Sequence, residues 1–91
     1  MNMLRIRAIE QIVKSFGNHR RIEILDLIGN NPELSVSEVA EKLKIDIKLA
    51  SIYLRRLTIS GLIMKKGSGK NIRHKITKRG SYVLTFVRML E

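Results

Sequence analysis

The sequence predicts a mostly α-helical fold with one small β-hairpin, in the order of four helices, the hairpin and a fifth helix. Three observations lead to this fold class. Apolar residues recur at helical spacing over most of the chain, the spacing changes to alternation from residue 62 on, and turn-forming residues separate these segments. The chain has 91 residues, 44% of them hydrophobic, which is enough for one packed domain and not for two.

Two helices are expected at the start of the chain. The first spans residues 3–16, where apolar side chains recur at helical spacing, and it ends at Gly17. The second spans residues 19–28 and begins after Asn18, whose side chain can accept a backbone N–H bond. We expect the turn-forming run Gly-Asn-Asn-Pro at residues 29–32 to end this helix.

Capping residues mark the next two helices. Ser35 and Glu38 form a capping box, which predicts a third helix that begins directly after Ser35 and runs to residue 43. A turn of three residues follows. Asp46 can then cap a fourth helix that runs to about residue 60, because its carboxylate accepts backbone N–H bonds and favours the positive end of the helix dipole.

The last part of the chain is expected to form the hairpin and the fifth helix. The segments 62–66 and 72–76 flank a turn-rich loop at residues 67–71, and the second segment alternates apolar and basic residues as a half-exposed strand does. Thr77 can cap a final helix that runs to about residue 90.

Positive charge is concentrated in one part of the chain. There are 18 Lys and Arg residues against eight Asp and Glu, a net charge of +10. Residues 42–79 contain twelve of the basic residues and one acid, Asp46. Such a block favours a surface for a polyanion, with nucleic acid as the first candidate and an anionic membrane surface as the second. No apolar run approaches the roughly 18 residues that would span a bilayer, so we do not expect an integral membrane protein. Nucleic acid is the first candidate, and no membrane partner is expected.

The composition also argues against other classes of function. Without cysteine the chain has no disulfide, no thiolate metal site and no cysteine nucleophile. Its two histidines do not lie in a plausible base position beside a nucleophile and an orienting acid. We therefore expect a protein that is not an enzyme, with no catalytic residues, no metal, no cofactor and no evident small-molecule substrate.

The third and fourth helices, joined by a three-residue turn, match the helix-turn-helix pattern, in which the first helix braces the second against DNA. On a helical wheel the fourth helix has a buried stripe that contains Ala50, Tyr53, Leu54 and Leu57. Lysine and arginine can donate to guanine edges or phosphates, serine can contact either, and isoleucine can contact a thymine methyl group. The residues of this recognition helix that we expect to contact DNA are Lys48, Ser51, Ile52, Arg55 and Arg56.

The hairpin adds five cations, and a basic wing of this kind typically lies on the sugar-phosphate backbone or in the minor groove. The wing residues that we expect to contact DNA are Lys65, Lys66, Lys70, Arg73 and Lys75. His74 alternates with Arg73 and Lys75, which predicts a partly buried structural histidine. The complete pattern is that of a winged helix-turn-helix with five helices and a two-stranded wing.

The last helix carries more apolar surface than one core requires. Its apolar side chains cover an arc of about 220°, wider than the stripe of an ordinary surface helix. A two-fold copy of the chain is the simplest cover for this surface, with residues 1–16 and 78–91 as the dimerisation helices. A dimer would place two recognition helices roughly 34 Å apart, one turn of DNA. The expected interface residues are Ile9, Ile12, Val13, Tyr82, Val83, Phe86, Val87 and Leu90.

From Gly17 to Gly80 the sequence resembles the ArsR-type winged-helix transcriptional regulators. The matching stretches are residues 17–25 (GNHRRIEIL), 36–43 (VSEVAEKL), 54–57 (LRRL), 61–63 (GLI) and 76–80 (ITKRG). The resemblance implies a homodimer that binds an operator and represses transcription, often released by a metal ion or another signal. Metal-sensing members have Cys-Val-Cys where this chain has Ser35-Val36-Ser37, and a serine hydroxyl does not replace a thiolate ligand.

The sequence therefore predicts a sequence-specific DNA-binding regulator, a homodimeric repressor without metal sensing, which acts in the cytoplasm on double-stranded DNA. One alternative is a winged-helix adaptor that binds a protein partner through Ile47, Ile52 and Ile59. Another is a non-specific architectural DNA-binding protein. Single-stranded nucleic acid is disfavoured because Phe16, Tyr53, Tyr82 and Phe86 are expected on buried helix faces, where they offer no stacking platform.

Overall fold

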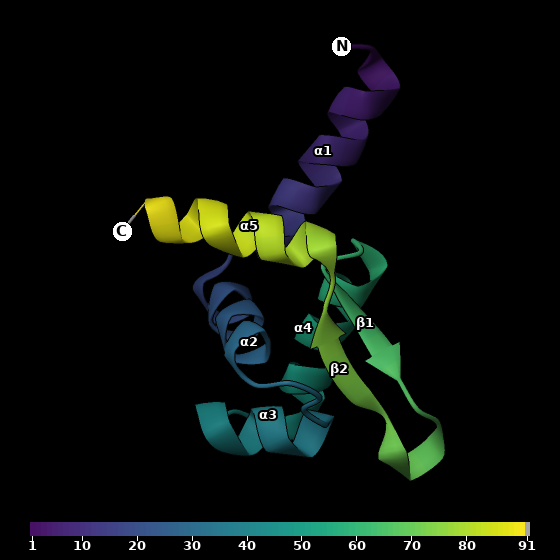
Figure 1. Ribbon diagram of the computed structural model, residues 1–91, viewed down its shortest axis with the longest axis vertical. Coiled ribbons are helices and arrows are strands. Elements are labelled where there is room, and N and C mark those ends of the chain that lie inside the picture. Colours follow the sequence, from purple (N-terminus) through teal and green to yellow (C-terminus); the bar gives the residue numbers. More distant parts are fainter. Residues whose placement is uncertain (91) are drawn as a thin grey trace.

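The computed structural model describes residues 1–90 and contains five α-helices, a two-stranded antiparallel hairpin and one 3₁₀ turn (Figure 1). This architecture confirms the expected winged helix-turn-helix fold. The elements in chain order are α1 (Met3–Phe16), α2 (His19–Asn30), α3 (Val36–Leu43), α4 (Ile47–Ile59), β1 (Ile63–Lys66), η1 (Gly69–Asn71), β2 (Arg73–Ile76) and α5 (Lys78–Met89).

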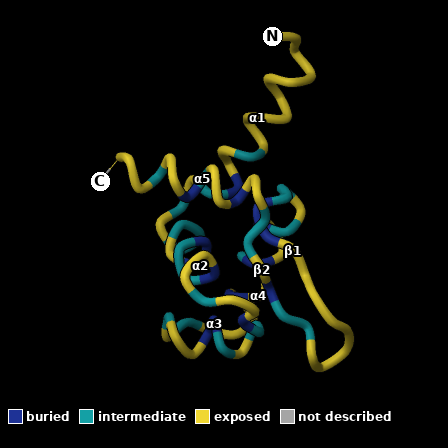
Figure 2. The backbone as a smooth tube through the Cα atoms, viewed as in Figure 1, coloured by how far each residue is buried: buried dark blue, intermediate teal, exposed yellow. Residues whose placement is uncertain are grey.

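One hydrophobic core lies where α2, α3, α4, α5 and the inner face of the hairpin meet (Figure 2). The helix α4 places Ala50, Leu54 and Leu57 in this core and leaves Tyr53 half-buried, as its periodicity predicts. The fully buried side chains from the other elements are Ile24, Leu25, Ile28, Val39, Leu62, Ile63 and His74.

The predicted helix starts are confirmed at each cap. Asn18 accepts a hydrogen bond from the backbone N–H of Arg20, and Thr77 accepts one from that of Gly80. These side chains satisfy N–H groups that have no partner within the helix. Capping is decided by residues within one turn of each other, which is why the sequence locates it well.

The predicted end of α2 is wrong by two residues. Gly29 does not stop the helix, which continues to Asn30 and ends at Asn31, where the amide side chain donates to the carbonyl of Leu27 at 2.8 Å. A Cβ atom on Gly29 would lie 2.6 Å from Leu84 Cδ2 of α5. The absence of a side chain at Gly29 leaves room for the Leu84 side chain of α5, although glycine inside a helix costs about 1 kcal/mol relative to alanine.

The hairpin pairs Ile63 with Ile76 and Lys66 with Arg73 at its two ends, and η1 forms the tip. The other edge of β2 does not face solvent throughout. His74 donates its backbone N–H to the carbonyl of Leu34 at 2.8 Å, and the two residues form an isolated antiparallel bridge. Leu34, in the segment before α3, thereby pairs with the edge of β2 that does not face β1.

The start of α5 lies tightly against the segment that joins α4 to β1. Thr77 donates its hydroxyl to the carbonyl of Gly61 at 2.6 Å, and its backbone N–H donates to Leu62. A Cβ atom on Gly80 would lie 2.0 Å from the carbonyl oxygen of Leu62, so only glycine fits there. This contact fixes α5 against the recognition helix and the wing.

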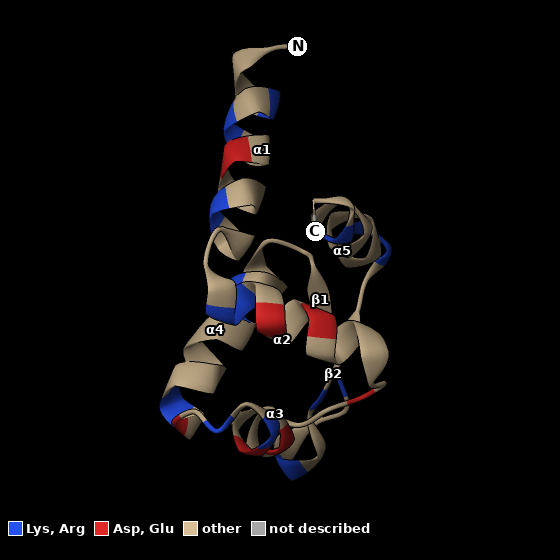
Figure 3. Ribbon diagram, turned by 90° about the vertical axis from the view of Figure 1, so that its left-hand side faces the viewer, with Lys and Arg blue, Asp and Glu red and all other residues tan. Residues whose placement is uncertain are grey.

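The helix α1 stands apart from the rest of the molecule (Figures 1 and 2). Residues 3–11 are exposed, and only the last turns contact the domain, where Ile12 and Phe16 pack against the core and Ser15 is buried. Figure 3 shows α5 end-on and separated from the projecting part of α1.

Candidate nucleic-acid interface

A short, well-capped α3 and a tight turn set the orientation of α4. The backbone N–H of Ser35 donates to Glu38 Oε1 at 3.0 Å, and the backbone N–H of Glu38 donates to the Ser35 hydroxyl at 3.2 Å, which completes the predicted capping box. Lys44 adopts a left-handed conformation with a φ of 55°, and Asp46 then caps α4 by accepting from the N–H of Lys48 at 2.6 Å. The turn between α3 and α4 is thus held at both ends.

A groove of about 620 Å³ lies between α4 and the wing. Ser51 and Arg55 line it from α4, and Lys65 and Lys70 line it from the hairpin. The structure therefore brings together four of the predicted DNA-contacting residues, two from each element. None of the groove-lining residues is acidic. We call this surface the α4–wing groove.

The beginning of α3 completes the α4–wing groove on a third side. Ser35 and Ser37 line it from the start of α3, and Ile72 and His74 line it from the hairpin. The sequence indicates a cap at Ser35 and places both Ser35 and Ser37 where metal-sensing regulators have cysteines, but it does not assign either serine to this surface. Their position at the start of a helix beside a predicted recognition helix is the one signal that indicates it.

The remaining residues of the predicted recognition surface are distributed differently. Lys48 and Ile52 are exposed on α4 outside the groove, at the turn-proximal part of the helix. Arg56 lies on another side of α4 and lines a second cleft, together with residues of α1 and α5. Arg55 and Arg56 are neighbours in sequence, yet they face different surfaces because successive residues of a helix are rotated by about 100°.

The five wing cations do not form a single cluster. The register pairs Lys65 with His74 on the inner face of the hairpin, whereas Lys66 and Arg73 pair on the outer face, which also carries Lys75. Of these five residues, only Lys65 and Lys70 line the α4–wing groove.

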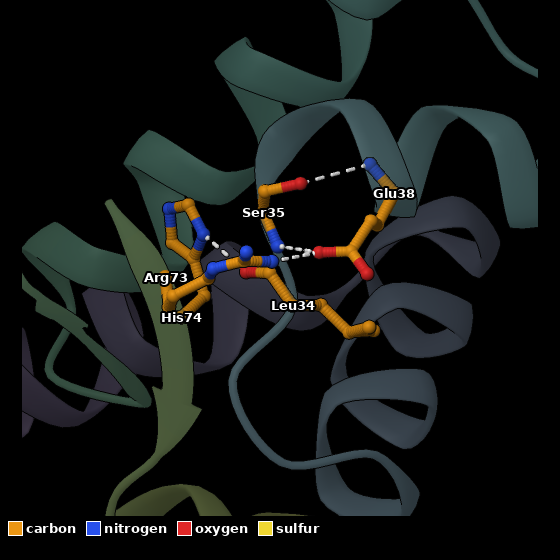
Figure 4. A network of polar contacts seen from close by, with 5 residues as sticks. All are labelled: Leu34, Ser35, Glu38, Arg73 and His74. Carbon is orange, nitrogen blue, oxygen red and sulfur yellow. Dashed lines mark hydrogen bonds and ion pairs between the residues drawn. The ribbon is translucent and has the colours of Figure 1, made fainter. Parts of the chain in front are cut away.

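Two of the wing cations are already paired with acids. Lys66 Nζ lies 2.8 Å from Glu33 Oε1, and Arg73 forms an ion pair with Glu38, the residue of the capping box (Figure 4). The hydrogen bond and charge of Lys66 lower the pKa of Glu33, and the same contact raises the pKa of Lys66. The pKa of Glu38 is lowered, mainly by the backbone N–H of Ser35.

These ion pairs join residues more than thirty positions apart, and no local sequence pattern predicts them. Their acids, Glu33 and Glu38, precede the basic block of residues 42–79 in the sequence. The positive potential of the wing therefore comes mainly from Lys65, Lys70 and Lys75.

His74 connects the wing to the segment before α3. It is buried, and its Nδ1 lies 3.0 Å from the carbonyl oxygen of Leu34, to which it can donate (Figure 4). Burial lowers the pKa of the imidazole from its ordinary value of 6.5, and the hydrogen bond to Leu34 acts in the opposite direction. The neutral ring is a structural link, as the alternation of the strand predicts.

A second surface is apolar. Most of the predicted dimer residues are exposed, with exposed fractions of 49% for Val13, 64% for Tyr82 and 54% for Phe86. Ile12 and Val83 instead pack partly against the core, and Val87 is half-buried. We call the exposed apolar residues of α1 and α5 the helical face. They are Met3, Leu4, Ile6, Ile9, Val13, Tyr82, Phe86, Met89 and Leu90. Position 91, the end of the predicted dimerisation segment, lies outside the described residues.

The described part of the chain contains no candidate metal site and no candidate membrane-spanning helix. Within residues 1–90 no three His, Asp or Glu side chains gather in a way that could hold a metal ion. None of the helices there is long and apolar enough to cross a membrane.

The match to a known family covers the helix-turn-helix and the helix that precedes it. A family described as winged helix-turn-helix DNA-binding matches residues 18–64, slightly more than half of the chain. This segment contains α2, α3 and α4 and the start of β1. A search of curated proteins found no match.

Solved structures with the same fold cover nearly the whole chain. One is the homodimeric winged helix-turn-helix DNA-binding domain of a possible ArsR-family transcriptional regulator from Mycobacterium bovis, with 23% identity, a TM-score of 0.86 and coverage of 96% of this chain and 81% of that chain. Reduced HlyU from Vibrio cholerae has 23% identity, a TM-score of 0.76 and coverage of 94% and 87%. An ArsR-like transcriptional regulator from Rhodococcus has 22% identity, a TM-score of 0.75 and coverage of 94% and 78%. At these identities the likeness establishes the fold.

Proposed function

Because this chain belongs to the winged helix-turn-helix DNA-binding family, we propose that it is a sequence-specific transcriptional regulator of double-stranded DNA. We further propose that it acts in the cytoplasm as a homodimeric repressor. The observation that carries the proposal is the α4–wing groove, where Arg55, Lys65 and Lys70 surround a concave surface without an acidic side chain. No catalytic role is proposed, since the family and the matched structures are DNA-binding domains and regulators.

The two sides of the groove are proposed to have different roles. Arg55 and Ser51 project from a helix and can reach base edges in the major groove, where arginine donates two parallel hydrogen bonds to guanine. Lys65 and Lys70 are flexible point charges on the wing and suit phosphate contacts, which position the protein without reading sequence. Lys48 and Ile52 lie at the start of α4 and would extend the base contacts, and Lys75 would extend the phosphate contacts.

The homodimer is proposed on the basis of the helical face. Val13 on α1 and Tyr82 and Phe86 on α5 are large apolar side chains that are exposed in the single chain, and a second copy is the simplest cover for them. The structurally similar domain from Mycobacterium bovis is homodimeric. Two copies related by a two-fold axis would present two recognition helices to successive major grooves.

The proposed regulator does not sense a metal ion. The chain has no cysteine, and Ser35 and Ser37 stand at the start of α3, where the Ser35 hydroxyl caps the helix and both residues line the α4–wing groove. Serine hydroxyls are poor ligands for the soft metals that thiolates bind.

The test is selection of duplexes from a random pool, followed by affinity measurements at two or more salt concentrations. Arg55→Ala should weaken binding to the selected duplex by roughly 1–3 kcal/mol and leave binding to an unrelated duplex nearly unchanged. Lys70→Ala should weaken binding to both duplexes equally and reduce the slope against salt by about one. Lys42→Gln, on the exposed side of α3, is the charge-matched control.

The outcome also decides between this function and two others. Equal loss on all sequences for Arg55→Ala and Lys70→Ala would indicate an architectural, non-specific protein. Absence of duplex binding even at low salt would favour the adaptor, for which α4 offers the exposed side chains of Ile47 and Ile52, whereas Ile59 is exposed beside the second cleft.

A further inference from the structure

A second cleft, of about 600 Å³, lies on a different side of α4 from the α4–wing groove. Its walls come from the C-terminal half of α1, the end of α4 and the beginning of α5. No residue lines both cavities. A volume of this size is in the range of sites for small organic molecules. We call it the α1–α4 cleft.

Three cations line the α1–α4 cleft, and none of its lining residues is acidic. Lys14 is paired with Glu10 at 3.0 Å. Arg79 donates from Nη1 to the carbonyl of Ser60 at 3.2 Å, which places its guanidinium over the end of α4. Within residues 1–90 the Arg56 side chain makes no ion pair or hydrogen bond that the structure records, so its guanidinium is available to a ligand.

The other wall of the cleft is apolar. Ala8 and Ile12 line it from α1, and Ile59 lines it from the last turn of α4. Ile59 is 76% exposed although it is a large aliphatic side chain. An isolated exposed isoleucine requires no explanation, but one that faces two apolar residues of another helix and lies one turn from an unpaired arginine forms an amphipathic pocket.

We propose that the α1–α4 cleft binds a small organic anion, a carboxylate attached to an apolar ring or short acyl chain. Arg56, with Arg79 beside it, would hold the carboxylate through charge-assisted hydrogen bonds. The apolar body would lie between Ile12 and Ile59. An inorganic anion would satisfy the arginines and leave this apolar wall in water.

The consequence for regulation rests on the proposed DNA-binding function. The cleft joins α1, a proposed dimerisation helix, to the end of α4, the proposed recognition helix. A ligand there would fix the angle between these helices, and with it the spacing of two recognition helices in a dimer. Such a molecule would be an effector that acts without touching the DNA surface.

The direct test uses 2-naphthoate with the full chain. The chain has no tryptophan, so binding can be followed by the fluorescence anisotropy of the naphthoate. We expect saturable binding that Arg56→Gln weakens at least about tenfold, the effect of losing one charge-assisted contact. Arg56 is exposed, so this variant should fold, which its circular dichroism would verify. Lys42→Gln removes the same charge from α3 and should leave the affinity within about twofold.

Two further measurements locate the ligand and define its class. In amide NMR spectra the shifts should be largest at Gln11 and Ser60, which line the cleft, and small at Ser51 and Lys70, which line the α4–wing groove. Neutral 2-naphthol and inorganic phosphate should both bind much more weakly than 2-naphthoate.

The possible failures are distinguishable. Absence of naphthoate binding, shifts confined to the α4–wing groove, or equal binding of phosphate would each overturn the effector site, whether or not the chain binds duplex DNA. Naphthoate binding at the cleft without any duplex binding would support the ligand site and overturn the proposed DNA-binding function.

Discussion

The α4–wing groove and the helical face are both exposed, but they differ in chemistry. The groove combines serines with arginine and lysine and is concave. The helical face consists of aliphatic and aromatic side chains on two helices that stand apart from each other (Figure 3). Binding through phosphate contacts weakens as the salt concentration rises, whereas association through apolar contacts shows no such loss. The proposed DNA contact and the proposed pairing of two copies can therefore be tested separately.

The largest effect is expected from a change in the packing of α5 against the segment that joins α4 to β1. Gly80→Ala places a methyl group against the carbonyl of Leu62, and the resulting shift of α5 should lower the free energy of unfolding by more than about 2 kcal/mol. At a helical position with free space, a change from glycine to alanine would raise the free energy of unfolding by about 1 kcal/mol, so the sign of the change tests the packing. Urea unfolding measures it, with Ser81→Ala, an exposed neighbour, as control. Unchanged or increased stability would contradict the close packing of α5.

The next largest effect concerns the helical face alone. Phe86→Asp places a charge on each side of the proposed two-fold interface and should weaken self-association by on the order of a hundredfold. Thr85→Asp, one residue away on the exposed polar side of α5, should leave association unchanged. Sedimentation velocity over a range of concentrations measures both variants. A wild-type chain that stays monomeric at high micromolar concentration would contradict the proposed dimer interface on the helical face.

A smaller effect is expected from pH, through His74. Its pKa is lowered in the folded chain, chiefly by burial, so the unfolded chain binds the proton more readily. The free energy of unfolding should therefore be at its full value above pH 6.5 and fall as the pH decreases below that value. Chemical unfolding at pH 7.5 and pH 5.5 measures the difference. His19→Gln, at an exposed position, should retain this dependence, and His74→Gln should lose it.

The smallest effect is expected when one cation of the wing loses its acidic partner. Glu33→Gln removes the partner of Lys66 and frees a cation, so duplex affinity at low salt should rise by a few fold. Because an exposed ion pair contributes little to stability, the unfolding free energy should change little. Glu23→Gln, which loses the partner of Arg20 on α2, is the matched control and should have less influence on DNA affinity. Equal gains for both variants would mean that only net charge matters.

The sequence predicts those parts of the fold that depend on near neighbours. The capping box of Ser35 and Glu38, the cap at Asp46 and the buried stripe of α4 all arise within one or two helical turns. The structure confirms each of them. Gly29 shows the limit, because a local turn signal does not end α2, which continues to Asn30 and is capped at Asn31.

The site is predicted less completely than the fold. Helical periodicity identifies Ser51 and Arg55 as exposed neighbours, and the structure places both in one groove. It could not show that Arg56 belongs to another cleft, that Glu33 neutralises Lys66, or that Glu38 serves both a helix cap and Arg73. These facts depend on how distant segments pack, and one sequence carries no direct signal of that packing. The DNA contacts and the interface remain predictions.

The bridge between Leu34 and His74 has a consequence for solubility in crowded conditions. A two-stranded ribbon has two open edges, and each can recruit a strand from another chain and begin an aggregate. Leu34 occupies part of one edge by accepting the backbone N–H of His74, and the strand at the other edge, β1, carries Lys65, whose charge discourages such additions. We therefore expect the short sheet to be a poor template for strand addition, even though the helices nearby expose apolar side chains.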